Sequence, residues 1–266
     1  MTKNRRTAKA EAKKEVATTQ QGLPPALASK MAEHAGKGVS GAAEDNLIPL
    51  IYILQALSPQ VNKKNPAYID GAEPSSIWLR NAPTPIIDGE VGVLFQPCHF
   101  TKGYVEWVPR DSGGGFVARH AALPVEAKAT KDSKNPNKVT YKMPNGNEVV
   151  ETRYHAGHVL TDAGPLPYII PMTGSGHTVS KSWMSVMNSH TLPDGNVMPS
   201  WSRAYRLRTK ERTNTVGQSW FSWDISDEGF VSEEDFDRGT RLNKACESGE
   251  KRAAAEEVVE PNSDTM

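Results

Sequence analysis

Aromatic residues are confined to the middle of this chain of 266 residues. The six tryptophans, seven tyrosines and six phenylalanines all lie between Tyr52 and Phe236. Segments that lack aromatic side chains and carry dense charge bury too little apolar surface to offset the entropy lost on folding. We therefore expect a flexible basic arm over residues 1–43, a single β-rich folded domain over 44–246 and a disordered acidic tail over 247–266.

Charge is distributed as unevenly as the aromatic residues. Lysine and arginine number 31, as do aspartate and glutamate, so the formal net charge is zero. The first 15 residues nevertheless carry six basic and two acidic side chains, whereas residues 224–266 carry five basic and 13 acidic ones. Such segregation of charge is typical of proteins that work with nucleic acids.

Nothing in the sequence indicates a membrane or an oxidising compartment. No stretch approaches the ~18 consecutive apolar residues of a spanning helix. The basic start, MTKNRRTAKAEAKK, has no apolar stretch behind it, as a secretory signal would. Cys98 and Cys246 are too few for a disulfide framework or a cysteine-built zinc site. We expect a cytoplasmic protein.

Short apolar segments bounded by turn residues predict a mostly β fold. The apolar segment 47–55 contains Pro49, which is poorly tolerated inside a sheet, so we expect an edge strand that begins near Leu50. The segment 144–147 (PNGN) lies between two strand-like runs and predicts a hairpin. Further strands are expected at 77–79, 91–97, 104–108 and 168–172, with residues 101–103 reversing the chain to form a second hairpin.

Two short helices complete an α+β pattern. Val179, Trp183 and Val186 recur at helical spacing within residues 178–189. Ser232 is a suitable N-cap for a second helix, with Asp235 three residues further on. Several short strands with few helices favour a small barrel or an elaborated sheet.

The segment SWSRAYRLRTKERTNTVGQSWFSWDI carries the strongest functional pattern. If residues 201–212 form a strand, Trp201, Tyr205 and Leu207 point to one side of it. The other side carries Arg206, Arg208, Lys210 and Arg212. Their spacing of ~7 Å is close to the phosphate repeat of an extended single strand of DNA.

Aromatic residues on the following strand-like run strengthen this pattern. Trp220 points to one face of that run, and Phe221 and Trp223 point to the other. Binding of single strands requires positive charge beside an aromatic surface on which bases stack. The cationic face therefore has a candidate stacking partner on the neighbouring strand.

The segment 100–110 repeats the combination of cations and aromatic rings. The predicted nucleic-acid-binding residues are Lys102, Tyr104, Trp107, Arg110, Arg119, Arg203, Arg206, Arg208, Lys210, Arg212 and Trp220. The alternative is that the cations form a solvated surface while the aromatic rings form the core.

Enzyme motifs are weak. The Gly174-Ser175-Gly176 loop precedes Lys181-Ser182, but the pattern of a phosphate-binding loop is not met. A metal-dependent nuclease that uses Glu151, His155 and His158 is the least favoured alternative, because histidines three residues apart are common by chance. We expect no enzymatic activity, no catalytic residue, no metal site and no cofactor.

Several longer segments resemble a known group of proteins. These segments are GAAEDNLIPLIYILQALSPQV, YIDGAEPSSIW, GVLFQPCHFTKGYVEWVPRDSGGGFVARH and PYIIPMTGSGHTVSKSW. They resemble single-stranded DNA-binding proteins of bacteriophages, which are found near replication and recombination genes. The resemblance implies an OB-fold-like small barrel with insertions and an acidic C-terminal tail that contacts replication or recombination proteins. Such tails commonly end in an aromatic residue, whereas this chain ends PNSDTM.

Two classes of function follow. The first is a phage protein in the host cytoplasm that binds and protects single-stranded DNA, largely without sequence preference, during replication or recombination. A homo-oligomer is compatible with this function. The second is a structural or scaffold-associated phage protein without enzymatic activity.

Overall fold

The computed structural model describes residues 30–31, 33–34, 47–131, 139–215 and 217–254. The chain divides into a unit of residues 1–41 and a unit of residues 42–266, and the folded body belongs to the second. The basic arm predicted for residues 1–43 lies outside the described residues, apart from positions 30–31 and 33–34.

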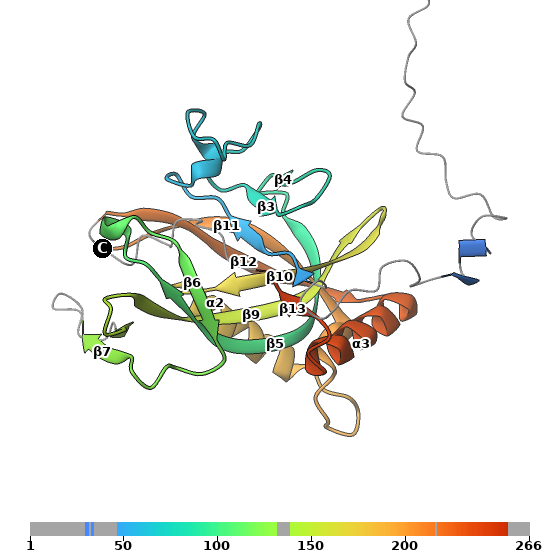
Figure 1. Ribbon diagram of the computed structural model, residues 1–266. Helices are drawn as coiled ribbons and strands as arrows, with labels where there is room; N and C mark the ends of the chain where they lie inside the picture. The colour runs from blue at the N-terminus through green and yellow to red at the C-terminus, as the bar shows by residue number, and fades with distance from the viewer. Residues whose placement is uncertain (1–29, 32, 35–46, 132–138, 216, 255–266) are drawn as a thin grey trace, which may run out of the picture. The chain divides into compact units, whose positions relative to one another are not determined.

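One large antiparallel sheet dominates the body (Figure 1). Its strands follow the order β12-β11-β5-β9-β8-β7, while β10 pairs with β9 and β6 pairs with β5. The strands are β5 (Val93–Trp107), β6 (Phe116–His120), β7 (Lys128–Lys131), β8 (Val139–Lys142), β9 (Glu148–Thr161), β10 (Gly164–Met172), β11 (Arg203–Thr213) and β12 (Ser219–Phe230).

Two smaller sheets and three 3₁₀ turns complete the β structure. The antiparallel sheet β2-β3-β4 comprises Ile51–Ile53, Ile77–Leu79 and Ile86–Ile87, and β1 (Leu47–Ile48) pairs in parallel with β13 (Arg252–Ala253). The 3₁₀ turns are η1 (Pro59–Val61), η2 (Arg110–Ser112) and η3 (Ser200–Ser202).

The large sheet curls around an apolar interior, which we call its inner side. Helix α2 (Gly176–Ser189) packs there and buries Trp183 and Met187 against Phe95 and Tyr205. Helix α3 (Glu233–Glu247) packs on the opposite, outer side, where Leu242 joins a second apolar cluster with Cys98. The two helices therefore cover opposite faces of the same sheet.

The side chain of Gln55 links the two ends of the curl. Strand β2 lies beside β10 through a bridge between Leu50 and Ile169, and it approaches β12 through Gln55. Gln55 Nε2 donates a hydrogen bond to the carbonyl oxygen of Phe221 (2.9 Å), and the Phe221 N–H donates to Gln55 Oε1 (2.9 Å). Within the described residues, β2 belongs to a separate sheet and is not paired with β12 as a strand, so the large sheet does not close into a barrel.

The mostly β, α+β fold class predicted from the sequence is confirmed, with α2 and α3 close to the expected helices. Ser232 caps α3 as expected, because its side chain accepts a hydrogen bond from the Asp235 N–H (3.1 Å). On α2, however, Val186 is exposed and Met187 takes its place against the core.

The hairpin predicted at residues 101–103 is wrong. Strand β5 continues through these residues and pairs with β9 along nearly its whole length. Gly103 does not turn the chain; a β-carbon there would lie 3.2 Å from the carbonyl oxygen of His120 on β6. The glycine thus permits the close approach of a third strand, which is a second common use of glycine within sheets.

The folded body extends past residue 246, where the acidic tail was predicted to begin. Strand β13 pairs with β1, and the Ala254 N–H donates to the carbonyl oxygen of Ile48 (2.9 Å). Residues 255–266, the rest of the predicted tail, lie outside the described residues. None of the helices described is long and apolar enough to cross a membrane.

Candidate nucleic-acid interface

The outer face of the β11–β12 hairpin carries a row of cations. Alternation along β11 buries Tyr205 and Leu207 in the core and directs the intervening side chains outward. The register places Arg212 directly opposite Trp220, and residues opposite each other in an antiparallel pair share a face. We call this surface the ribbon face; it consists of Arg206, Arg208, Lys210, Arg212 and Trp220.

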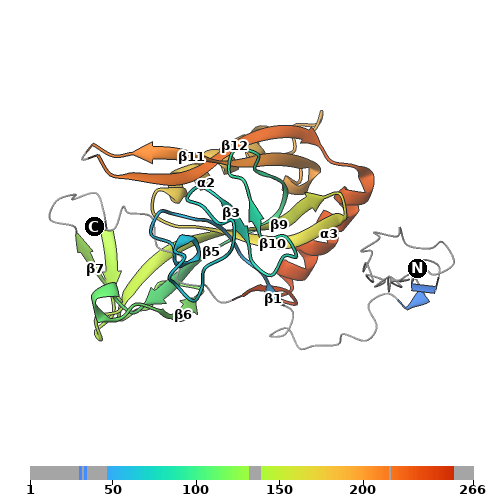
Figure 2. The same cartoon turned by 90° about the horizontal axis from the view of Figure 1, so that it is seen from above.

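The local sequence explains why this hairpin is long and regular. Its turn is closed by two side chains, since Asn214 Nδ2 donates to Gln218 Oε1 (2.8 Å) and the Gln218 N–H donates to Asn214 Oδ1 (2.9 Å). Gly217 has a φ of 84°, a left-handed conformation that glycine adopts without strain. The resulting ribbon projects away from α3 (Figure 2).

The cations of the ribbon face are held loosely. Arg206 Nε lies 4.0 Å from Glu228 Oε1, and Arg208 reaches the Ser226 hydroxyl only at 3.4 Å. Lys210 and Arg212 are exposed, and Trp220 is half-buried. Asp224 and Glu228 lie on the same side of the ribbon, so its net charge is smaller than the row of cations implies.

A β-bulge in β5 decides which predicted residues share a face with this row. Before the bulge, Leu94 pairs with Arg206 and lies on the outer side, whereas Phe95 pairs with Tyr205 and lies on the inner side. The register then shifts between Pro97 and His99. This extra residue moves even-numbered side chains from the outer side to the inner side.

Lys102 and Tyr104 consequently lie on the face opposite to the ribbon face. Phe100 pairs with His155, Lys102 with Arg153 and Tyr104 with Glu151, all on the inner side. Tyr141 of β8 meets Tyr104 edge-to-face, with ring centroids 6.5 Å apart. We call this second surface the inner track; it consists of Phe100, Lys102, Tyr104, Tyr141 and Arg153.

Two other predicted residues, Arg203 and Trp107, have structural partners, and the side chain of a third, Arg110, is not described. Arg203 binds Asp227 through Nε (2.8 Å) and lies over the ring of Phe230. Trp107 packs edge-to-face against Phe116 beside the outer apolar cluster. Arg110 begins η2, and its side chain is outside the part of the chain that the structure describes.

Arg119 holds the C-terminal strand in place. Its guanidinium donates to the carbonyl oxygens of Ala253 (3.1 Å) and Ala254 (2.8 Å) and to the Tyr154 hydroxyl (3.1 Å). These contacts use its donors within the fold, so we leave Arg119, Arg203 and Trp107 out of the interface proposed below.

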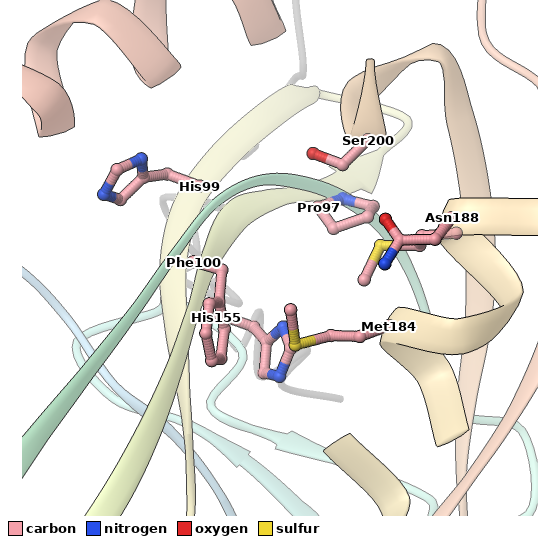
Figure 3. A pocket seen from close by; sticks show the side chains of 8 residues that line it. Pro97, His99, Phe100, His155, Met184, Asn188 and Ser200 are labelled. Atoms are coloured by element: carbon pink, nitrogen blue, oxygen red, sulfur yellow. The ribbon is translucent and has the colours of Figure 1, made fainter. Parts of the chain in front are cut away.

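A small cavity lies at the end of the inner track that is formed by Phe100, between β5 and α2. It has a volume of about 100 Å³, and Figure 3 shows Phe100, His155 and Met184 close together on one side of it, with His99 directed away. Sites for cofactors and drug-sized ligands occupy roughly 300–1,000 Å³. The cavity is therefore too small for such a ligand.

The two histidines of the nuclease hypothesis lie on opposite sides of the sheet. His155 faces inward, where its Nε2 is 2.8 Å from the Ser180 hydroxyl and its ring lies against Trp183. His158 faces outward, toward Gln96 and Cys98. Burial lowers the pKa of His155 to about 3 and that of His158 to about 4, so both are neutral near pH 7. Within the described residues, no three His, Cys, Asp or Glu side chains cluster as metal ligands.

Sequence reasoning missed Tyr141, Phe100 and Arg153. A signal for Tyr141 exists, because it lies in the strand-like run before the predicted PNGN hairpin; the structure pairs it with Val149. Phe100 and Arg153 depend on the bulge near Pro97. A proline is a signal for a bulge only inside a central strand, and the local sequence does not show that β5 is central.

The fold and the two surfaces define an α+β protein built on one curled antiparallel sheet, with cations and aromatic rings on both faces. A profile of Pam3 phage gp34-like proteins matches residues 16–252, and the chain belongs to this family. It is therefore a phage-associated protein. Searches among curated proteins and among solved structures gave no match.

Proposed function

We propose that this protein binds single-stranded DNA, largely without sequence preference, during phage DNA replication or recombination. The observation that carries the proposal is the register that sets Trp220 beside Arg212, at the end of a row formed by Arg206, Arg208 and Lys210. An aromatic ring adjacent to a line of cations is the arrangement by which proteins hold single strands.

The geometry of the ribbon face matches the chemistry of this ligand. Cations on alternate residues of a strand repeat at ~7 Å, which suits successive phosphates. A half-buried tryptophan ring offers a face for a base, and stacking is worth about 1–3 kcal/mol per base. Neither contact reads the hydrogen-bonding edge of a base, which is why we propose weak sequence preference.

The partners proposed beyond DNA follow from charge. Glu256, Glu257, Glu260 and Asp264 give the C-terminal end an acidic character. Acidic segments of this kind attract basic protein surfaces, so we propose contacts with replication or recombination proteins through residues 255–266. The proposed protein has no enzymatic activity of its own and requires no cofactor; homo-oligomers are compatible with this function.

One observation favours the alternative, a structural or scaffold-associated phage protein. Phe230 is 68% exposed at the end of β12 and lies 4.6 Å from the Arg203 guanidinium. Exposed aromatic side chains beside arginine are common in protein–protein contacts. This alternative predicts a stable assembly whose formation does not depend on DNA.

The test is a titration with oligo-dT at two salt concentrations, followed by tryptophan fluorescence, with duplex DNA as the control ligand. We expect quenching by single strands that weakens steeply with salt. The double variant Arg206→Ala/Arg208→Ala should lower the affinity about 100-fold, at about tenfold per lost phosphate contact.

A matched control removes two cations elsewhere. Lys63 and Lys64 are exposed in the loop after η1, and Lys63→Ala/Lys64→Ala should bind like the wild type. Normal binding by a folded Arg206→Ala/Arg208→Ala protein would show that the ribbon face is not the interface. Absence of any binding at low salt, together with an assembly unchanged by DNA in light scattering, would favour the structural alternative.

A further inference from the structure

We infer that the inner track is a second binding site for single-stranded nucleic acid, separate from the ribbon face, so that one chain holds two strands at once. This inference rests on the proposed function, because it takes single strands as the ligand. The ribbon face would bind one nucleic-acid strand, and the inner track would bind the other.

The inner track repeats the pattern of the ribbon face in a different order. Phe100, Lys102 and Tyr104 alternate along β5, so that ring, cation and ring follow one another on one side of a strand. Alternate residues are ~7 Å apart, which again suits successive nucleotides of an extended strand. Arg153 from β9 and Tyr141 from β8 widen this line on one side, because β9 pairs with β5 and β8 lies beyond β9.

The contacts between these side chains orient them for binding. The Lys102 ammonium lies 5.7 Å from the centre of the Tyr104 ring, and Arg153 lies 5.9 Å from the centre of the Phe100 ring. Glu151 lies between the two cations, 3.5 Å from Lys102 and 3.6 Å from Arg153. Lys102 and Arg153 outnumber Glu151 at this point. The next carboxylate on this face, Glu106, is bound to Asn147 (2.6 Å) and His120 (3.0 Å). The lysine side chain remains 45% exposed.

Helix α2 covers part of this face. Ser180 and Trp183 contact His155, next to Phe100. In the first turn of the helix, His177 Nε2 donates to the carbonyl oxygen of Glu151 (2.9 Å), the residue opposite Tyr104, so the helix reaches the level of that tyrosine. Lys102 remains exposed, and Tyr104 and Tyr141 keep part of their surface exposed.

The two surfaces are on opposite sides of one sheet, and this separation has a measurable consequence. A short oligonucleotide that occupies the ribbon face does not reach through the sheet to the inner track. Each chain should therefore bind two short oligonucleotides and hold them together. A protein with one continuous path around an edge of the sheet should bind only one.

The experiment combines stoichiometry with a bridging assay on the full chain. Calorimetric titration with a short oligo-dT gives the number of oligonucleotides bound per protein chain. Two oligo-dT probes that carry different fluorophores show energy transfer when the same protein complex binds both. The number per chain separates two sites on one chain from one site on each member of an oligomer. We expect two strands per chain, and energy transfer that falls again in excess protein.

Variants assign the two sites. Tyr104→Leu/Tyr141→Leu keeps apolar bulk against Val149 but removes both rings, and should weaken one of the two binding events about tenfold. The Arg206→Ala/Arg208→Ala protein should lose the other event. Either variant alone should lower energy transfer, at probe concentrations near the wild-type dissociation constants, while one strand per chain still binds. If the leucine variant fails to fold, Lys102→Gln, at an exposed position, serves in its place.

The outcomes distinguish this inference from the proposed function. One strand per chain in the wild type, lost in Arg206→Ala/Arg208→Ala and unaffected by the inner variants, would overturn the second site and leave the proposed function intact. One strand per chain that both sets of variants weaken would indicate a single continuous path and would also overturn it. Absence of all binding would remove the proposed function as well.

Discussion

The ribbon face and the inner track use the same residue types in two different ways. On the ribbon face the arginines have only distant polar neighbours, such as Glu228 at 4.0 Å from Arg206. On the inner track Lys102 and Arg153 share Glu151 and lie against aromatic rings. The first surface offers loosely held charge, and the second offers side chains that are already arranged. Salt should therefore affect the ribbon face more than the inner track.

The alternation of β5 after its bulge near Cys98 creates this difference, and shifting that alternation by one residue gives the largest effect we predict. Inserting one alanine between His99 and Phe100 should move Phe100, Lys102 and Tyr104 to the outer side and expose the apolar side chains that now pack there. We expect the loss of more than about 5 kcal/mol of folding free energy, which is the range of a small domain's whole stability. Urea unfolding followed by circular dichroism measures it.

The control for this insertion keeps the residue count of β5. Cys98→Ala removes one buried sulfur atom from the outer cluster and leaves the alternation of the strand unchanged. It should unfold cooperatively, at a cost of about 1 kcal/mol. If the insertion protein were as stable as Cys98→Ala, the alternation after the bulge would not be what separates the two surfaces.

Acid should destabilise the protein through one histidine on each side of the sheet. Burial lowers the pKa of His155 to about 3 and that of His158 to about 4, whereas both titrate near 6.5 in the unfolded chain. Below pH 6.5 the unfolded chain binds more protons than the folded one, so stability falls as the pH falls. Each histidine should contribute a loss of about 2 kcal/mol between pH 7 and pH 5.

Urea unfolding at pH 7 and pH 5 checks this dependence. His155→Gln and His158→Gln should each remove about 2 kcal/mol of the loss, because each eliminates one titrating group, and His177, whose pKa burial also lowers, adds to what remains. Control variants at the exposed Lys63 and Lys64 should leave the pH dependence unchanged. A loss that stays the same in both glutamine variants would show that other groups cause it.

The smallest predicted effect compares one lysine from each surface. Lys210→Gln should flatten the salt dependence of oligo-dT binding by roughly 0.7, the value for one phosphate contact on a single strand. Lys102→Gln should flatten it less, because Glu151 already neutralises part of that charge and raises the pKa of Lys102. Fluorescence titrations at four salt concentrations provide both slopes, and equal slopes would contradict the difference between the surfaces.

Alternation within a single strand proved sufficient for part of the structure. The cationic row of β11, the PNGN hairpin and the Ser232 cap follow from local rules, and the structure has all three. Trp201 did not follow the rule: it lies in η3, next to Phe236, because the strand begins only at Arg203. A helix-capping contact is local, whereas the start of a strand depends on its partner.

The grouping of the two surfaces required information from outside β5. Simple alternation from Leu94 would place Lys102 and Tyr104 on the same side as Arg206. The bulge between Pro97 and His99 reverses that assignment, and it exists where β5 bends between its pairing with β11 and its pairing with β6. Pairing between distant segments sets such bends, so the local sequence does not reveal them.

The hydrogen bonds between Gln55 and Phe221 allow separation of β2 from β12 to be measured at a single amide proton. Because the Phe221 amide proton is held by a side chain rather than by a neighbouring strand, its exchange with deuterium depends on the separation of β2 from β12. The exchange rate of that amide, compared with rates in the centre of β9, measures how often β2 separates from β12. Nucleic acid on the ribbon face would contact the same strand, so bound and free protein should differ at this proton.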